Sequence, residues 1–247
     1  MTNPKPKTKY EEMADFINGL MPNEVLSEFK YARARKILKS LENIIPEDEY
    51  LIFDAIIEVF NNNLLGAYEK AQQASVVSEK ILVLDNVLYV YEKVFSLYDS
   101  VQVLNKKAVI GKKLGKSLKE SVVDDVELVL TISGKIKEIE FEIEELSEHQ
   151  KINIKRLQTS LNALDMHNED LYALMKIIHN LLILKNTRCL YTEYCGLQED
   201  LLILIYVDAP IEHIALLNDL LFEECYCKDL LEPLNKISYS FVPFEGK

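Results

Sequence analysis

The segment GKKLGKS (111–117) contains the residue types of a phosphate-binding loop. In the P-loop pattern G-x-x-x-x-G-K-[ST], backbone N–H groups and a lysine surround the phosphates of a nucleotide. The spacing here is one residue short, because the first glycine is Gly111 and the required position holds Ile110. Ser117 instead begins an S-x-x-E capping box, and Gly111 and Gly115 suit a chain reversal between two helices. We therefore interpret the segment as a lysine-bearing helical turn.

The four cysteines are the next candidates, because all lie near the C-terminal end of the chain. Structural zinc sites prefer pairs of ligands separated by two to four residues. The pairs here are Cys189-x5-Cys195 and Cys225-x-Cys227, and neither has that spacing. Cys227 falls on the apolar side of a predicted helix. We expect buried structural thiols and no metal ion.

The four histidines do not favour an enzyme either. A di-iron site in a helical bundle needs Glu-x-x-His, and no histidine has a glutamate three residues before it. The motifs HExxH and GxSxG are also missing from the sequence. Asp124, Asp125 and Glu127 could bind Mg²⁺, but such spacing is common on acidic helices. We expect no catalytic residue and no cofactor; the alternative is a helical-bundle enzyme that uses metal or nucleotide near 111–125.

The net charge of −12 argues against binding to nucleic acid or an anionic membrane. Basic residues nevertheless gather in two segments, 30–39 and 106–119, either of which could meet a phosphate or an acidic partner. The N-terminus, MTNPKPKTKY, is not followed by the apolar region of a signal peptide, and no apolar run is long enough to span a bilayer. We expect a cytoplasmic protein with reduced cysteines and no nucleic-acid or membrane partner.

Only seven glycines and seven prolines interrupt the chain, which favours long helices with short connections. The strongest heptad pattern covers 67–104, which we predict to be one long central helix. Further helices are predicted over 9–20, 23–44, 46–60, 129–146, 150–166, 169–186, 197–207 and 209–231. Two alternatives involve strands. EIEFEI (138–143) could pair with KINIKRL (151–157) as a hairpin, so both a helical and a strand interpretation stay open for 136–157. LLILIYVD (201–208) also has the composition of a strand.

These elements predict an all-α fold, an antiparallel bundle of about eight or nine helices with long central helices. We expect a single all-helical domain over 9–235, preceded by a flexible basic tail at 1–8 and followed by a C-terminal tail at 236–247.

Six short segments, in the right order, resemble the 14-3-3 family of phosphopeptide-binding adaptors. They are KYEEM (9–13), KILKSLE (36–42), DNVLYVYEK (85–93), LGKSLK (114–119), RLQTSLN (156–162) and LLND (216–219). KYEEM is similar to the family's Arg-Tyr-Asp-Asp-Met, and DNVLYVYEK to its Asn-Asp-Val-Leu-x-Leu-Leu-Glu-Lys. Two positions depart from the family pattern: Glu120 stands where the family has Tyr, and Leu220 where it has Asn.

The resemblance implies a nine-helix bundle that dimerises through its N-terminal helices. It places Lys119 on the family's phosphate-binding Arg, with Arg33 and Lys36 matching its other basic residues. Asn162 corresponds to an Asn that holds the ligand backbone. Leu216 and Leu217 lie on the helix that would contact the side chains of the peptide.

We therefore expect a non-catalytic helical adaptor that binds protein partners, including peptides with phosphoserine or phosphothreonine. Apart from the enzyme near 111–125, the remaining alternative is an acidic scaffold or inhibitor whose surface binds a basic protein.

Overall fold

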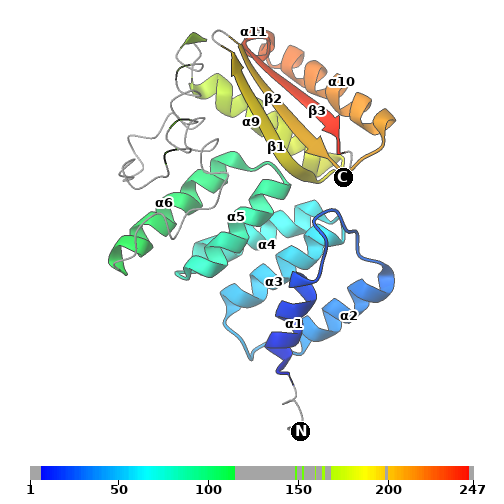
Figure 1. The fold of residues 1–247 in the computed structure, drawn as a ribbon, viewed down its shortest axis with the longest axis vertical. Coiled ribbons are helices and arrows are strands. Elements are labelled where there is room, and N and C mark those ends of the chain that lie inside the picture. Colours follow the sequence, from blue (N-terminus) through cyan, green and yellow to red (C-terminus); the bar gives the residue numbers. More distant parts are fainter. Residues whose placement is uncertain are drawn as a thin grey trace.

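The computed structural model describes residues 7–114, 168–197 and 200–244, together with the single residues 148, 152, 159, 163 and 164. These residues form nine helices and a three-stranded sheet. The fold is therefore mostly helical, and the expectation of an all-α bundle holds only approximately. Helices α1 to α6 lie below the sheet in Figure 1, whereas α9, α10 and α11 lie beside it.

The first six helices are α1 (Lys9–Asn18), α2 (Glu28–Lys39), α3 (Glu47–Phe60), α4 (Leu64–Val77), α5 (Ile81–Lys93) and α6 (Leu97–Lys113). Capping explains where several of them begin. Thr8 and Glu11 form a capping box on α1, and the side chain of Ser27 accepts a hydrogen bond from the backbone of Lys30. The predictions of helices over 9–20 and 46–60 are confirmed. The helix expected from Asn23 begins later, because Ser27 is its cap.

Residues with positive φ, other than glycine, end several helices. Asn62, Phe95, Asn186 and Asp229 have φ values of 56°, 53°, 50° and 58°. At each site the next residue donates a backbone hydrogen bond to the residue five positions earlier, as in a Schellman motif. Asn and Asp tolerate this left-handed conformation better than most residues. A chain with few glycines can therefore still stop its helices sharply.

The prediction of a single helix over 67–104 is wrong, because the chain forms three helices there, α4, α5 and α6. The first break lies at Ser78, whose hydroxyl donates to Asp48 Oδ2 at 2.8 Å. The second lies at the Schellman motif of Phe95. Gly111 is buried inside α6, so it does not provide the turn that we expected. The capping box at Ser117 lies outside the described residues.

The C-terminal half consists of α9 (Asn168–Leu184), β1 (Cys189–Leu197), β2 (Asp200–Val207), α10 (Ile211–Cys227), α11 (Leu231–Lys236) and β3 (Ile237–Pro243). Strands β1 and β2 are antiparallel, while β3 pairs with β2 in parallel after the crossover through α10 and α11. The helix predicted over 197–207 is therefore wrong. The helix predicted over 209–231 corresponds to α10, which ends at Cys227. The short α11 follows from Leu231, and β3 occupies most of the expected C-terminal tail.

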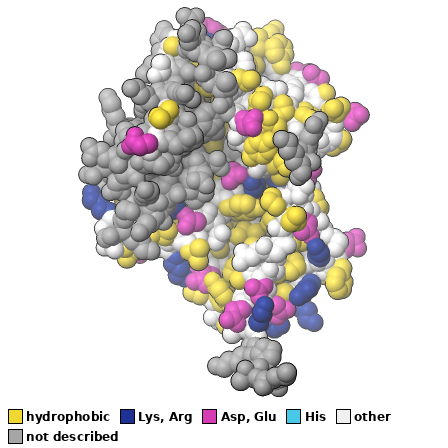
Figure 2. All heavy atoms as spheres, viewed as in Figure 1, with side chains coloured by type: hydrophobic (Ala, Val, Ile, Leu, Met, Phe, Trp, Pro, Cys, Tyr) yellow, Lys and Arg dark blue, Asp and Glu magenta, His cyan; other side chains and the backbone are white. Residues whose placement is uncertain are grey.

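The sheet has one buried face. Leu201, Ile203 and Ile205 of β2 are almost inaccessible, as are Ile237 and Phe241 of β3. They share a core with α9 and α10. The other face is more open, with Tyr191 and Leu202 each 37% exposed, and apolar side chains gather beside the sheet in Figure 2. Among the described residues, the sheet thus buries one face against α9 and α10 and leaves the other more accessible.

A second core lies among α1 to α6 and contains buried residues from Met13 to Leu104. Arg188, at the start of β1, joins the two halves. Its side chain is 2% exposed, and Nη1 donates to the backbone oxygen of Glu24 at 3.0 Å. Lys93 of α5 donates to the backbone oxygen of Leu190 at 2.7 Å. Buried cations bonded to backbone oxygens therefore connect the halves.

Most predictions for 115–167 lie outside the described residues, including the helix predicted over 129–146 and the strand alternative at 138–143. Within 150–166, the described residues 152, 159 and 163 are helical. Among the helices that the structure describes, none combines the length and apolar character that crossing a bilayer requires.

Candidate functional site

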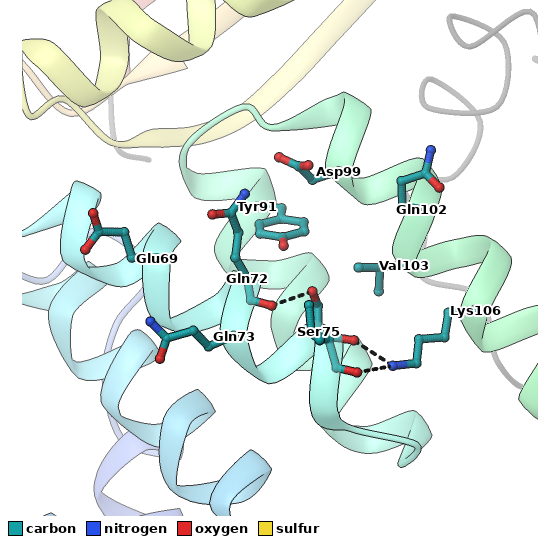
Figure 3. Close-up of a pocket in the computed structure, with 10 residues that line it drawn as sticks. Glu69, Gln72, Gln73, Ser75, Tyr91, Asp99, Gln102, Val103 and Lys106 are labelled. Carbon is teal, nitrogen blue, oxygen red and sulfur yellow. Dashed lines mark hydrogen bonds between the residues drawn. The ribbon is translucent and has the colours of Figure 1, made fainter.

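A polar cleft of about 810 Å³ lies among α4, α5 and α6 (Figure 3). We call it the polar cleft; its lining residues are Glu69, Gln72, Gln73, Ser75, Val76, Tyr91, Asp99, Gln102, Val103 and Lys106. Helices α4 and α6 both pack on α5, which brings side chains 30 residues apart in the chain to one site. Three amides and two carboxylates are among these described residues.

Lys106, the lysine among the described residues of the polar cleft, already binds to backbone groups of the protein. Lys106 Nζ donates to the backbone oxygens of Ser75 and Val76 at 2.7 and 2.9 Å, as Figure 3 shows. These oxygens belong to the last turn of α4, where the carbonyls lack helical partners and the helix dipole is negative. Glu69 and Asp99 form no ion pair with a described residue. The polar cleft therefore favours a positively charged group.

Asp99 is held in place by two hydroxyl groups. Tyr68 Oη and Ser96 Oγ both donate to Asp99 Oδ2, at 2.6 and 2.5 Å. Gln72 Nε2 donates in turn to Tyr68 Oη at 2.7 Å. Burial, and then the hydrogen bond to Asp99, raise the pKa of Tyr68 far above its ordinary value. The phenol therefore keeps its proton, and the carboxylate is fixed as an acceptor.

A second cavity, of about 530 Å³, lies where the turn between α5 and α6 meets α9. We call it the aromatic pocket; it is lined by Tyr68, Phe95, Ser96, Leu97, Tyr98, Asp99, Glu169, Tyr172, Met175, Lys176 and His179. The rings of Tyr98 and Tyr172 meet at 89° with centroids 5.7 Å apart. Asp99 is the residue common to both cavities.

The turn that shapes the aromatic pocket depends on Phe95. Its ring is buried in the C-terminal core, and its backbone adopts a φ of 53°. The left-handed conformation costs about 1 kcal/mol for a residue of this kind. Burial of the phenyl ring more than compensates for this cost. The turn then directs Ser96 towards Asp99.

His179 lies between the two halves of the protein. Its Nδ1 is 2.8 Å from the backbone oxygen of Val94, and a carbonyl can only accept, so this nitrogen carries the hydrogen. Burial lowers the pKa of His179, although the bond to Val94 opposes the shift. The ring is therefore neutral near pH 7. It lies 4.7 Å from the ring of Tyr68.

The described residues of these cavities do not form a nucleophile with its base. A Ser-His-Asp arrangement needs the histidine between the other two residues, whereas Ser96 donates directly to Asp99. The proton of Tyr68 is held more tightly than in solution. Ser96, Asp99 and His179 therefore do not form such a triad.

Four of the six residues predicted to bind a phosphopeptide are described, and they lie on two different helices. Arg33 and Lys36 are exposed on α2, and basic side chains gather at the lower end of the protein in Figure 2. Leu216 and Leu217 lie on α10, which Figure 1 places in the other half. Leu217 is fully buried and Leu216 is 43% exposed.

Lys119 and Asn162 lie outside the described residues, so their positions relative to α2 and α10 stay a prediction. Arg33 faces Glu12 of α1, with Nη2 to Oε1 at 3.9 Å. Arg33, Lys36, Leu216 and Leu217 line neither cavity.

No group of three His, Cys, Asp or Glu side chains that could hold a metal ion occurs in the part of the chain that the structure describes. Cys189 and Cys225 are buried, whereas Cys227 is exposed. The expectation that Cys227 lies in the core is therefore wrong. The buried cysteine of α10 is Cys225, because the side of the helix that packs on the sheet includes the residue two positions before the one that the sequence pattern indicated.

The chain matches no protein-family model, no curated protein and no solved structure.

Sequence reasoning missed Tyr68, Asp99 and His179. No short motif identifies them, because they come from three helices, α4, α6 and α9. The prediction of one helix over 67–104 also did not include the turn that directs Ser96 towards Asp99. The nearest signal was the histidine itself, a polar residue in the apolar run LMKIIHNLLIL of α9.

Proposed function

We propose that this protein is a non-catalytic adaptor that binds an extended, basic segment of a partner protein in the polar cleft. The observation that carries the proposal is the state of the cleft's charges: Lys106 is engaged with backbone oxygens, while Glu69 and Asp99 have no ion-pair partner among the described residues. A Lys or Arg of the partner would form charge-assisted hydrogen bonds with these carboxylates.

The glutamines of the polar cleft support a peptide as the ligand. A carboxamide both donates and accepts, as a peptide group does, so Gln73 and Gln102 can bond to the backbone of an extended segment. Both side chains are exposed and free to reorient. The net charge of −12 adds long-range attraction for a basic partner.

Selection from a random peptide library, followed by calorimetry, tests this proposal. We expect selected peptides to contain Lys or Arg, to lose affinity when these residues become Gln, and to bind more weakly at high salt. Glu69→Gln should weaken binding about two- to fivefold, the value of an exposed ion pair. The matched control is Glu223→Gln on α10, which should bind normally. Selected peptides without basic residues, or equal binding by the Glu69 variant, would reject the proposal.

Phosphopeptide binding is the second candidate, and the exposed face of α2 supports it. Arg33 and Lys36 are three residues apart on one side of the helix, and Lys36 and Lys39 form no ion pair with a described residue. With Lys119 and Asn162, they would hold a phosphate as the resemblance to 14-3-3 proteins implies. Phosphorylated and unphosphorylated forms of one peptide should then differ in affinity. Equal affinities, together with no effect of Lys36→Glu or Lys119→Glu, would exclude this candidate.

A further inference from the structure

We infer that the aromatic pocket binds an N-methylated ammonium group, such as a trimethyllysine side chain or a free choline-like cation. This inference goes beyond the proposed adaptor function, because it concerns a separate cavity; of the described lining residues, only Asp99 belongs also to the polar cleft.

Aromatic rings form several walls of this pocket. Tyr98 and Tyr172 meet at right angles, and Tyr68 lies with His179 at 59° between ring planes. The faces of these rings therefore point in different directions within one cavity. The face of an aromatic ring is negative and attracts a cation, and cages of such rings recognise quaternary ammonium groups.

The charges around the pocket also favour a cation. Asp99 is fixed by the hydroxyls of Tyr68 and Ser96, and the exposed Glu169 adds a second carboxylate at the start of α9. Lys176 is the opposing charge and is exposed at the rim. His179 is neutral near pH 7, because burial lowers its pKa. Among the described residues that line the pocket, two carboxylates therefore oppose one ammonium group.

The lining distinguishes a methylated ammonium from a primary one. A primary ammonium carries three N–H donors, and each needs an acceptor when it leaves water. Asp99 Oδ2 already receives two hydroxyl hydrogens, which leaves Oδ1 as the one open oxygen of this carboxylate for the three donors. A quaternary, trimethylated ammonium has no N–H group and needs no such acceptor. Its methyl groups can pack on the tyrosine rings and on the thioether of Met175.

The first experiment is a calorimetric titration of the full chain with choline and with 3,3-dimethylbutanol, its neutral counterpart of the same shape. We expect choline to bind at least about tenfold more tightly, because only choline carries the charge that the rings attract. Equal binding of the two compounds, or no binding of choline and of a trimethyllysine peptide, would overturn the inference.

Substitutions of two exposed residues localise the binding. Tyr98 is 55% exposed, so Tyr98→Leu should fold normally and reduce choline affinity about tenfold, whereas Tyr98→Phe keeps the ring and should retain the affinity. Lys176→Gln removes the opposing charge and should tighten binding about two- to threefold. An unchanged affinity in both Tyr98→Leu and Lys176→Gln would place the cation elsewhere and overturn the inference.

The source of the cation follows from a third comparison. A peptide with trimethyllysine is titrated beside the same peptide with unmodified lysine, and beside free choline. Tighter binding of the trimethylated peptide identifies a protein partner, and tighter binding of choline identifies a small molecule. Glu69→Gln should leave choline binding unchanged, since Glu69 lines only the polar cleft, so a failure of the adaptor proposal can be told apart from a failure here.

Discussion

The side-chain amide of Asn218 forms two hydrogen bonds with the backbone of Phe241. Its Oδ1 accepts from the N–H at 2.9 Å, and its Nδ2 donates to the C=O at 3.0 Å. Phe241 belongs to β3, which lies at an edge of the sheet, so these backbone groups face away from β2. The amide of α10 thus takes the place of a neighbouring strand and protects an edge that could otherwise pair with another chain.

Asn218→Ala should lower the free energy of unfolding by about 1–3 kcal/mol, because it leaves two backbone groups without their partner. Asn218→Asp should also destabilise, since a carboxylate can accept from the N–H but cannot donate to the C=O. Urea unfolding measures both effects. The exposed neighbour Asp219 provides the control, as Asp219→Ala should change stability little. An equal loss in Asn218→Ala and Asp219→Ala would contradict the structural role of the amide.

Tyr68→Phe should destabilise the protein by about 1–2 kcal/mol. The substitution keeps the ring but removes the hydroxyl that donates to Asp99 and accepts from Gln72. Tyr226→Phe is the matched control, because Tyr226 is 69% exposed on α10. Thermal or urea unfolding measures the stability of both variants. Equal stabilities would disprove the role of this hydrogen-bond network.

His179 should make stability depend on pH. Burial lowers its pKa in the folded protein, so between that pKa and the ordinary value near 6.5 the unfolded chain binds more protons. The contribution of neutral His179 to the free energy of unfolding should therefore be fully present above pH 6.5. It should decrease as the pH falls, by up to about 1.4 kcal/mol per pH unit. Asp99 opposes this shift, whereas Lys176 adds to it.

The measurement compares the wild-type chain with His179→Gln by urea unfolding from pH 5 to 7.5. Glutamine can still donate to the backbone oxygen of Val94 but does not titrate. As the pH falls, the free energy of unfolding of the wild-type chain should decrease relative to that of the variant. A difference that stays constant over this range would show that His179 does not sense pH.

The two cysteines near the end of α10 should react at different rates. Burial raises the pKa of the Cys225 thiol to about 11, so very little thiolate is present at pH 8. Cys227 is exposed. Iodoacetamide should therefore label Cys227 in the native protein and Cys225 only after unfolding, as peptide mass spectrometry would show. Fast native labelling of Cys225 would mean that α10 is rotated or frays in solution.

Helix ends with a local signal were predictable from the sequence. Pro46 followed by Glu47 and Asp48 marks the start of α3, and Asn61-Asn62-Asn63 marks its end. Both signals act within one turn of the helix, through a fixed φ, acids at the positive end of the dipole, and a residue that tolerates positive φ. No other part of the fold has to be known for them to work.

The breaks inside 67–104 were not predictable in this way. Phe95 ends α5 in a conformation that its own side chain disfavours, and it does so because its ring is buried in the C-terminal core. Neither break contains Gly or Pro. The apolar stripe of each short helix continues the spacing of the one before, so the periodicity resembles that of a single long helix.

The sheet was hidden for a related reason. Every residue of LLILIYV is apolar, so the alternation of buried Leu201, Ile203 and Ile205 with more accessible neighbours does not show in the sequence. A strand also needs partners, and β2 finds one of them in β3, beyond α10 and α11. A helix bonds within itself, whereas a strand depends on the position of distant residues.

The sequence by itself determined the mainly helical character of this protein, its acidic charge, and the starts of α1 and α3. Only the tertiary structure decided that LLILIYV is a strand, that Phe95 stops a helix, and that Asp99 joins Tyr68 beside His179. The physical reason is the sequence separation over which each interaction acts. Capping, φ preference and net charge act on neighbouring residues or on the whole chain, whereas strand pairing, burial and a cavity wall require contacts between residues far apart in the sequence.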